Sequence, residues 1–210
     1  MIYKLSNVAE KNTVEEAVNI QFRFPNMYKP KMVFDGFNEI VIPIITIENR
    51  KYIQQAIWGI LPENYDGEWN DFQKIVNTQF ISLKKLKKHL IFKESLLKRR
   101  CLVIVTGFVT AYLKEGGLKR FLIQQKNRMP FYLAGIYNVT DDGFSTCSII
   151  TTKKSHFLSE YQNITSLMPI KIDDNKQEKW LNPDLSEREL MKAIKPLDDF
   201  SDFEIKEMTE

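Results

Sequence analysis

The amino-acid sequence predicts an α+β protein with a curved, largely antiparallel sheet. Two observations predict this class. Segments rich in β-branched and aromatic residues outnumber those with helical periodicity. Most of these segments also follow one another with short turns between them, which favours antiparallel neighbours. The 210 residues are 43% hydrophobic and 27% charged, so we expect a single domain over residues 1–210 with its own core.

The first part of the chain predicts one helix followed by strands. Thr13 and Glu16 have the spacing of a capping box, and apolar residues recur at helical intervals from about Val14 to Gln21. Pro43 lies inside the second predicted strand, which places it at an edge or a bulge. The predicted strands are Met32–Phe34, Ile40–Ile47 and Gln54–Trp58.

The longest apolar run extends from Cys101 to Tyr112 and is interrupted by Gly107. It predicts a core hairpin, a buried strand that bends at Gly107 into a second strand. Upstream of this run, Ile75 and Val76 indicate a strand that ends at Asn77–Gln79. The next segment predicts an amphipathic helix, because leucines share one face and lysines occupy the remainder. These leucines are Leu83, Leu86 and Leu90.

The remainder of the chain predicts three strands and then three helices. Turn residues at Glu115–Gly117 and Asp141–Gly143 separate the strands. The strands are Leu118–Gln124, Phe131–Val139 and Phe144–Thr152, and the helices are Ser155–Gln162, Lys176–Leu181 and Ser186–Ile194.

Composition excludes several classes of function. The two cysteines, Cys101 and Cys147, lie in separate apolar runs, a pattern that fits neither a disulfide framework nor a metal site. We expect both to be reduced core residues, and we expect no metal and no cofactor. The apolar runs are too short to span a membrane, and the start of the chain does not have the pattern of a signal peptide. We therefore expect a cytoplasmic protein that does not bind membranes.

A lysine cluster is the main concentration of charge, since the net charge is only +3. It comprises Lys84, Lys85, Lys87 and Lys88. Two interpretations stay open, a solvated helix face and a surface that attracts phosphates.

Short sequence blocks recur along the chain in a characteristic order. They are Trp58-Gly59-Ile60-Leu61-Pro62, Asn77-Thr78-Gln79, Arg100-Cys101-Leu102, Gly107-Phe108, Ala134-Gly135-Ile136-Tyr137, Ser148-Ile149-Ile150-Thr151-Thr152, Met168-Pro169 and Trp180-Leu181. In this order and spacing, over roughly residues 1–200, the chain resembles the SOS-response-associated peptidase (SRAP) family. The resemblance implies a mixed sheet or open barrel flanked by helices, and a role in DNA damage at abasic sites of single-stranded DNA.

The residues that carry the family's chemistry are replaced in this chain. In the family, a cysteine at position 2 becomes the first residue and crosslinks to the abasic aldehyde through its α-amine and thiol. Here that position is Ile2, which has no thiol and should leave Met1 in place. The family's glutamate corresponds to Thr110, and its histidine to Gln162 or, with a shorter spacing, to Thr165. None of these side chains moves protons near neutral pH.

The positions implied to contact DNA are altered too. Gln79 and Leu167 stand where the family has arginines, so two cations that pair with phosphates are lost. Asn77 is retained, either as a ligand contact or as an amide that bonds the backbone. The aromatic residue that follows the Trp-Gly-x-x-Pro block is displaced, with Asn64 and Tyr65 near its place.

Three hypotheses for function follow. The first is a catalytically silent SRAP-like protein that binds single-stranded DNA weakly or serves a protein partner of unknown identity. The second is a residual DNA-processing enzyme that forms a Schiff base through the Met1 α-amine or a lysine. The third is an unrelated small-molecule enzyme using carboxylates such as Asp35, Asp66, Asp71 and Glu115. Whether the chain is an enzyme at all stays open at this point, and we favour the first hypothesis.

Overall fold

Five strands of the larger sheet close into a ring. The computed structural model describes residues 4–88, 90–194 and 200–208. The ring consists of β4 (Val41–Thr46), β5 (Tyr52–Trp58), β7 (Arg100–Val105), β10 (Phe131–Val139) and β11 (Ser145–Lys153). Neighbouring strands in the order β11-β10-β7-β4-β5 are antiparallel, and β11 then pairs in parallel with β5 at Thr146 and Cys147. This ring confirms the predicted α+β class with a curved, mostly antiparallel sheet.

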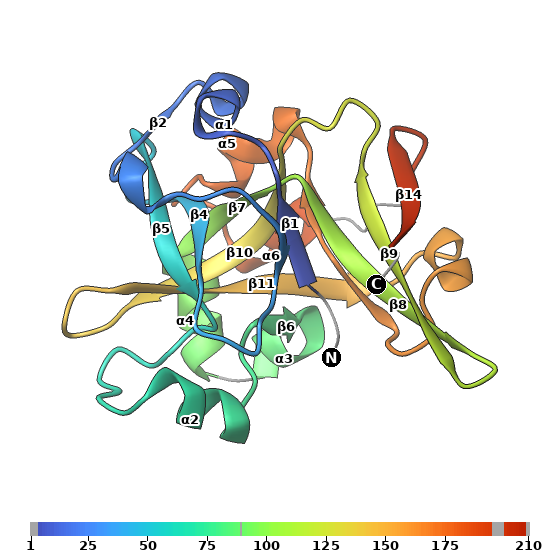
Figure 1. Ribbon diagram of the computed structural model, residues 1–210. Helices are drawn as coiled ribbons and strands as arrows, with labels where there is room; N and C mark the ends of the chain where they lie inside the picture. The colour runs from blue at the N-terminus through green and yellow to red at the C-terminus, as the bar shows by residue number, and fades with distance from the viewer. Residues whose placement is uncertain (1–3, 89, 195–199, 209–210) are drawn as a thin grey trace.

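A second sheet of five strands extends from one side of the ring (Figure 1). Its order is β14 (Phe203–Met208), β9 (Gly117–Gln125), β8 (Gly107–Lys114), β1 (Lys4–Asn7) and β3 (Lys31–Phe34). β8 and β9 form a long hairpin, and the strands of both chain ends, β1 and β14, lie in this sheet.

The apolar run through Gly107 is not the predicted hairpin. β7 belongs to the ring, whereas β8 pairs with β1 and β9 in the second sheet. The chain crosses between sheets at Thr106, whose backbone N–H donates to the Ser6 carbonyl at 2.9 Å. At Gly107 a Cβ atom would lie 2.8 Å from the Ile123 carbonyl oxygen, so glycine is required for β9 to approach. The hairpin was predicted because an apolar run does not encode which partner each strand takes.

Both faces of β7 are buried. Cys101 and Val103 point into the core shared by the two sheets, and Leu102 and Ile104 pack against the other core beneath the helices. Because neither face meets water, the strand is apolar at every position from Cys101 to Val105 rather than at alternate ones. Cys101 and Cys147 are fully buried and unpaired, as the sequence predicted.

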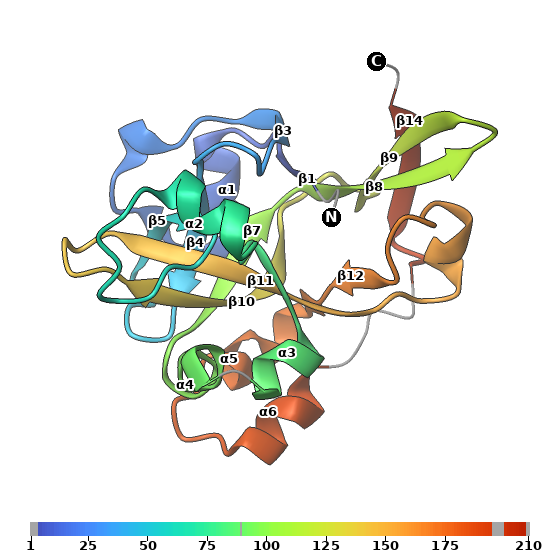
Figure 2. The same ribbon diagram turned by 90° about the horizontal axis from the view of Figure 1, so that it is seen from below.

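Four helices gather on one side of the ring, as Figure 2 shows. They are α3 (Leu83–Lys88), α4 (Leu90–Lys98), α5 (Gln177–Trp180) and α6 (Glu187–Ala193). In α6 the Ser186 side chain accepts from the Glu189 backbone N–H and the Glu189 carboxylate accepts from that of Ser186, a complete capping box. α1 (Lys11–Val18) begins before the predicted start, and its N-cap Glu10 makes no side-chain cap bond, so the predicted capping box at Thr13 is wrong.

Short elements account for the remaining differences. Ile75 ends the helix α2 (Trp69–Ile75), so the strand predicted there is wrong, and Asn77–Gln79 form the connection to β6 (Phe80–Ser82). The helix predicted from Ser155 is a single 3-10 turn, η2 (Phe157–Glu160). Other short elements were not predicted: β2 (Gln21–Phe22), η1 (Pro25–Met27), β12 (Leu167–Pro169), β13 (Lys171–Ile172) and η3 (Asp174–Lys176). Pro43 lies where β4 is not yet paired with β7, which agrees with its predicted edge position.

Candidate functional site

Thr110, which the resemblance aligns with the family's glutamate, is buried in the second sheet. Its strand β8 pairs with β1, and Lys4 lies opposite Val109, one residue before Thr110. The Thr110 side chain is 1% exposed, and its hydroxyl donates to the Tyr161 carbonyl at 3.1 Å. The site position thus holds a hydroxyl whose proton is already bound to a backbone oxygen. Ile2, the third altered position, lies outside the described residues.

Gln162 follows Tyr161, whose carbonyl accepts the hydrogen bond from Thr110, so the fold brings Thr110 and Gln162 close together. Gln162 is 1% exposed, and its amide nitrogen donates to the carbonyls of Thr165 and Leu167, both at 2.8 Å. Lys154 donates to the Gln162 backbone carbonyl. The Gln162 side chain therefore stabilises the loop that leads into β12 by bonding to its backbone. Thr165, the alternative counterpart of the histidine, lies in this same loop and accepts from the Leu167 backbone N–H at 3.2 Å.

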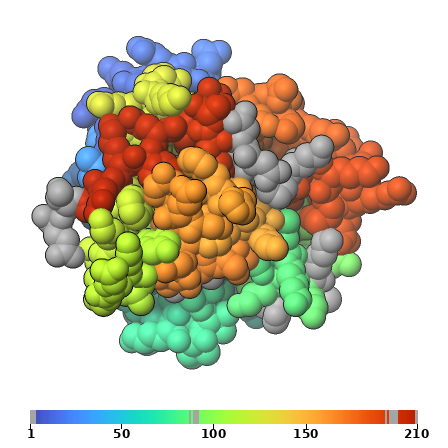
Figure 3. All heavy atoms as spheres, turned by 90° about the vertical axis from the view of Figure 1, so that its right-hand side faces the viewer, coloured from blue at the N-terminus to red at the C-terminus, as the bar shows by residue number. Residues whose placement is uncertain are grey.

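This region is covered by the chain itself. Figure 3 shows the orange segment around η2 packed between the β8–β9 hairpin and β14. Aromatic contacts support the packing, since the Tyr161 ring lies edge-on to Phe121 at 5.3 Å between ring centroids. Phe157 stacks on Phe200 at 5.1 Å.

Asn77 and Gln79 form a second polar group that faces the loop after β3. Asn77 is exposed and donates to the Gln79 side-chain oxygen at 3.2 Å. The Gln79 amide nitrogen donates in turn to the Gly36 carbonyl, and Gln79 is only 7% exposed. Gln79 therefore holds backbone together rather than facing solvent. Leu167, the other position that the resemblance assigns to an arginine, is half-buried at the start of β12.

The lysine cluster forms the outer face of α3. Lys84, Lys85 and Lys88 are exposed and Leu86 is fully buried, as predicted, but Leu90 belongs to α4 and not to the predicted helix. None of these three lysines has an ion-pair partner among the described residues. The side chain of Lys87 lies outside the described part of the chain. The free ammonium groups keep both interpretations of this surface open.

The carboxylates suggested for a small-molecule enzyme are dispersed. Asp35 pairs with Lys4 at 2.9 Å. Burial alone would raise the pKa of Asp35, but the hydrogen bonds from Lys4 and the Phe37 amide outweigh it and hold the pKa below its usual value. Asp71 pairs with Lys74 on α2, and Glu115 lies in the β8–β9 turn. Asp66 instead lines a cavity of about 250 Å³ with Glu39, Glu68 and Asp142.

The described residues contain neither a cluster of metal-ligating side chains nor a membrane-spanning helix. Over residues 4–88, 90–194 and 200–208, no group of three or more His, Cys, Asp or Glu side chains is placed to hold a metal ion. Within those ranges, no helix has the length and apolar character needed to cross a membrane.

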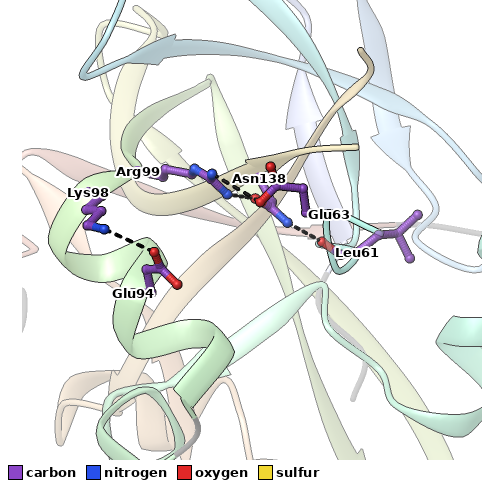
Figure 4. Close-up of polar contacts among 6 residues, drawn as sticks. All are labelled: Leu61, Glu63, Glu94, Lys98, Arg99 and Asn138. Atoms are coloured by element: carbon purple, nitrogen blue, oxygen red, sulfur yellow. Dashed lines mark hydrogen bonds and ion pairs between the residues drawn. The ribbon is translucent and has the colours of Figure 1, made fainter. Parts of the chain in front are cut away.

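The Trp-Gly-x-x-Pro block is anchored from two sides. The Trp58 indole N–H donates to the Gln79 carbonyl at 3.0 Å. Downstream, Asn138 donates to the Leu61 carbonyl at 2.9 Å, and Arg99 contacts both Asn138 and Glu63 (Figure 4). This loop is therefore fixed to β10 and to the start of β7. Sequence reasoning singled out the block but had no signal for Arg99 and Asn138, because both contacts are long-range.

Solved structures place this architecture in a known class. A crystal structure of a protein from Bacteroides thetaiotaomicron superimposes with a TM-score of 0.86 at 25% identity, covering 98% of this chain and 91% of the other. A protein from Bordetella bronchiseptica gives a TM-score of 0.81 at 10% identity over the whole of both chains, a likeness of fold alone. The ring, the second sheet and the helices thus define an established fold class.

The chain belongs to the SOS response associated peptidase (SRAP) family, whose pattern it matches over residues 3–209. This confirms the resemblance found in the sequence. Among its relatives are two proteins of Bacillus subtilis strain 168. The abasic site processing protein YoqW is 24% identical over 169 residues, 78% of this chain and 72% of the relative. The abasic site processing protein YobE is 24% identical over 200 residues, 92% of this chain and 88% of the relative.

Proposed function

We propose that this protein is a catalytically silent SRAP-family member that associates weakly with single-stranded DNA and does not crosslink to abasic sites. The association with DNA is supported by the names of its two relatives, both abasic site processing proteins. The proposed lack of catalytic activity is supported by the side chains that occupy the reactive positions.

The observation that carries the proposal is the environment of Thr110. General acid–base catalysis needs a group that exchanges protons near neutral pH and reaches the substrate. The Thr110 hydroxyl does neither, since it is 1% exposed and donates to Tyr161. Gln162 also has no titrating group, and its amide is engaged with two backbone carbonyls. Neither position retains a proton-transfer role.

The lack of a thiol at Ile2 completes the argument from sequence. A stable thiazolidine needs an α-amine and a thiol on one residue. The Met1 amine alone would form only a Schiff base, which water hydrolyses. Mass spectrometry of the protein made in a bacterial cytoplasm should show Met1 retained.

Trapping with borohydride tests the proposal. The protein is incubated with single-stranded DNA that carries one abasic site, with and without sodium borohydride, and a strand without the abasic site is the control. We expect no adduct in any lane. An adduct formed without borohydride contradicts the loss of crosslinking. A borohydride-dependent adduct that N-terminal acetylation abolishes contradicts silence and supports Schiff-base chemistry at Met1.

A further inference from the structure

An apolar groove lies between the segment around η1 and the strands β4 and β5. It has a volume of about 480 Å³ and is lined by Met27, Tyr28, Phe34, Ile40, Val41 and Pro43. This volume falls within the range typical of ligand pockets. Met27 is 52% exposed and Val41 36% exposed, so apolar surface at the groove faces solvent.

The groove also has a polar rim with an excess of positive charge. Lys29, Lys31 and Glu39 line it. Neither Lys29 nor Lys31 has an ion-pair partner in the described part of the chain. In the wall, the Gln55 amide nitrogen donates to the Phe24 carbonyl at 3.2 Å, which identifies its oxygen as the acceptor. That buried oxygen has no hydrogen-bond partner among the described residues, which is uncommon in folded proteins.

The groove is close to the counterpart of the family's reactive site. β3, which carries Lys31 and Phe34, pairs directly with β1, with Phe34 opposite Leu5. The residue after Phe34 is Asp35, which pairs with Lys4. A four-residue strand spans roughly 13 Å, so the groove lies about one strand length from Lys4, where β1 meets β8.

We propose that this groove binds an unpaired nucleotide of a single DNA strand, with the base against the apolar walls and a neighbouring phosphate near Lys29 and Lys31. Apolar walls beside two cations fit a base and its neighbouring phosphate, the two parts of a single strand that proteins hold without sequence preference. This inference rests on the proposed function, because it assumes that the protein meets single-stranded DNA.

Two methionines of similar exposure provide a matched test. Met27 is 52% exposed and lines the groove, whereas Met32 is 55% exposed and does not. Met27→Glu and Met32→Glu change the net charge equally. Each variant is titrated at low salt into a fluorescein-labelled oligothymidine, and into a strand of equal length whose nucleotides carry no bases.

Binding to the base-bearing strand should weaken by about fivefold or more in Met27→Glu, the lower end of the effect of losing one base contact. Met32→Glu should match the parent protein, and the baseless strand should not distinguish the two variants. Photocrosslinking with a 5-iodouracil strand should label peptides from residues 24–43, and free thymidine monophosphate should compete poorly.

The outcomes separate this inference from the proposed function. If the parent protein binds the oligothymidine but Met27→Glu and Met32→Glu behave alike, the groove assignment is wrong and the proposed function stands. If the parent protein binds neither strand at low salt, both the DNA association and the groove assignment fail. If thymidine monophosphate competes as well as the strand, the groove is a free-nucleotide site and the assignment to a DNA strand is wrong.

Discussion

The junction around Arg100 and the pair Thr110–Gln162 both belong to regions of family resemblance, and the sequence predicts that only the first keeps the family's side chains. Arg100 is fully buried and donates to the carbonyls of Leu96, Leu97 and Trp180, each at 2.7 Å. It also donates to Asn182. These acceptors lie at the C-terminal ends of α4 and α5, where carbonyls have no partner within the helix.

The charge of Arg100 is held without a carboxylate. Burial, and secondarily the nearby cation of Arg50, lowers the pKa of Arg100 to about 10. The group remains protonated at neutral pH, and the negative ends of two helix dipoles favour it there. The Trp180 ring adds a cation–π contact at 5.7 Å from the guanidinium carbon to the ring centroid, and its indole N–H donates to Cys101.

The comparison separates two kinds of family residue. Arg100, Trp58 and Trp180 hydrogen-bond to backbone carbonyls far away in sequence, so the fold depends on them. Thr110 and Gln162, which the resemblance assigns to the family's reactive positions, also bond to backbone oxygens. Under the proposed function, the fold persists while its reactive groups are exchanged for groups that support the main chain.

Restoring the chemistry should give the largest effect, a change from no crosslink to a detectable one. The triple variant Ile2→Cys, Thr110→Glu, Gln162→His introduces the cysteine, glutamate and histidine that the resemblance assigns to the family's reactive positions. We expect some covalent adduct with abasic single-stranded DNA, measured by gel shift under denaturing conditions without borohydride. Ile2→Cys alone is the control for a thiol without its acid–base partners. No adduct from the triple variant would show that the residue correspondences are wrong or that the DNA path is closed.

Removing the helix anchor should be the largest effect on stability. Arg100→Leu leaves the carbonyls at two helix ends without a partner, and we expect it to lower the free energy of unfolding by about 3–5 kcal/mol. Urea denaturation followed by circular dichroism measures this. The matched control is Arg188→Leu, because Arg188 is exposed on α6. Equal stability of both variants would contradict the role assigned to Arg100.

A lysine variant tests where residual DNA affinity originates. A variant that combines Lys84→Gln, Lys85→Gln and Lys88→Gln should bind DNA with a weaker dependence on salt. The slope of log affinity against log salt concentration should fall by the equivalent of up to about three phosphate contacts. The control variant replaces Lys11, Lys51 and Lys126 with glutamine, so that its net charge equals that of the first variant. In the parent protein, binding should be mostly gone by about 200 mM salt, with no preference for abasic strands. A salt-tolerant, abasic-selective complex would restore a sensing role to the Thr110 region.

The smallest expected effect is a dependence of stability on alkaline pH. Burial, with a smaller contribution from Cys147, raises the pKa of Cys101, and burial raises that of Cys147. The unfolded chain then loses these protons at lower pH than the folded one. The contribution of the two thiols to the free energy of unfolding is therefore complete at pH values below their pKa in the unfolded chain. It decreases as the pH rises above that pKa, by about 1 kcal/mol between pH 8 and pH 9. The Cys101→Ala, Cys147→Ala variant should have a flatter pH profile in urea denaturation, and an equal slope would contradict this account.

Local patterns determined much of the fold. The strand Phe131–Val139 coincides with its prediction. The turn at Glu115 and Gly116 has positive φ values of 50° and 80° as its residues suggested, and Ser186 caps α6. Each of these depends on neighbours in sequence, so periodicity and turn chemistry reveal them. The family blocks are likewise local sequence patterns, and the resemblance rests on them.

Tertiary structure decided the features that join distant segments. Only the fold shows that β7 and β8 enter different sheets, that β11 closes the ring onto β5, and that Thr110 bonds to Tyr161. β1, with four residues, is too short to show a period, yet its pairing with β8 and β3 links the chain start to the candidate site and the groove. Strand partners are chosen by packing over long sequence separations, and an apolar run is compatible with many partners. The sequence therefore determined many of the elements, and the tertiary contacts determined where their residues meet.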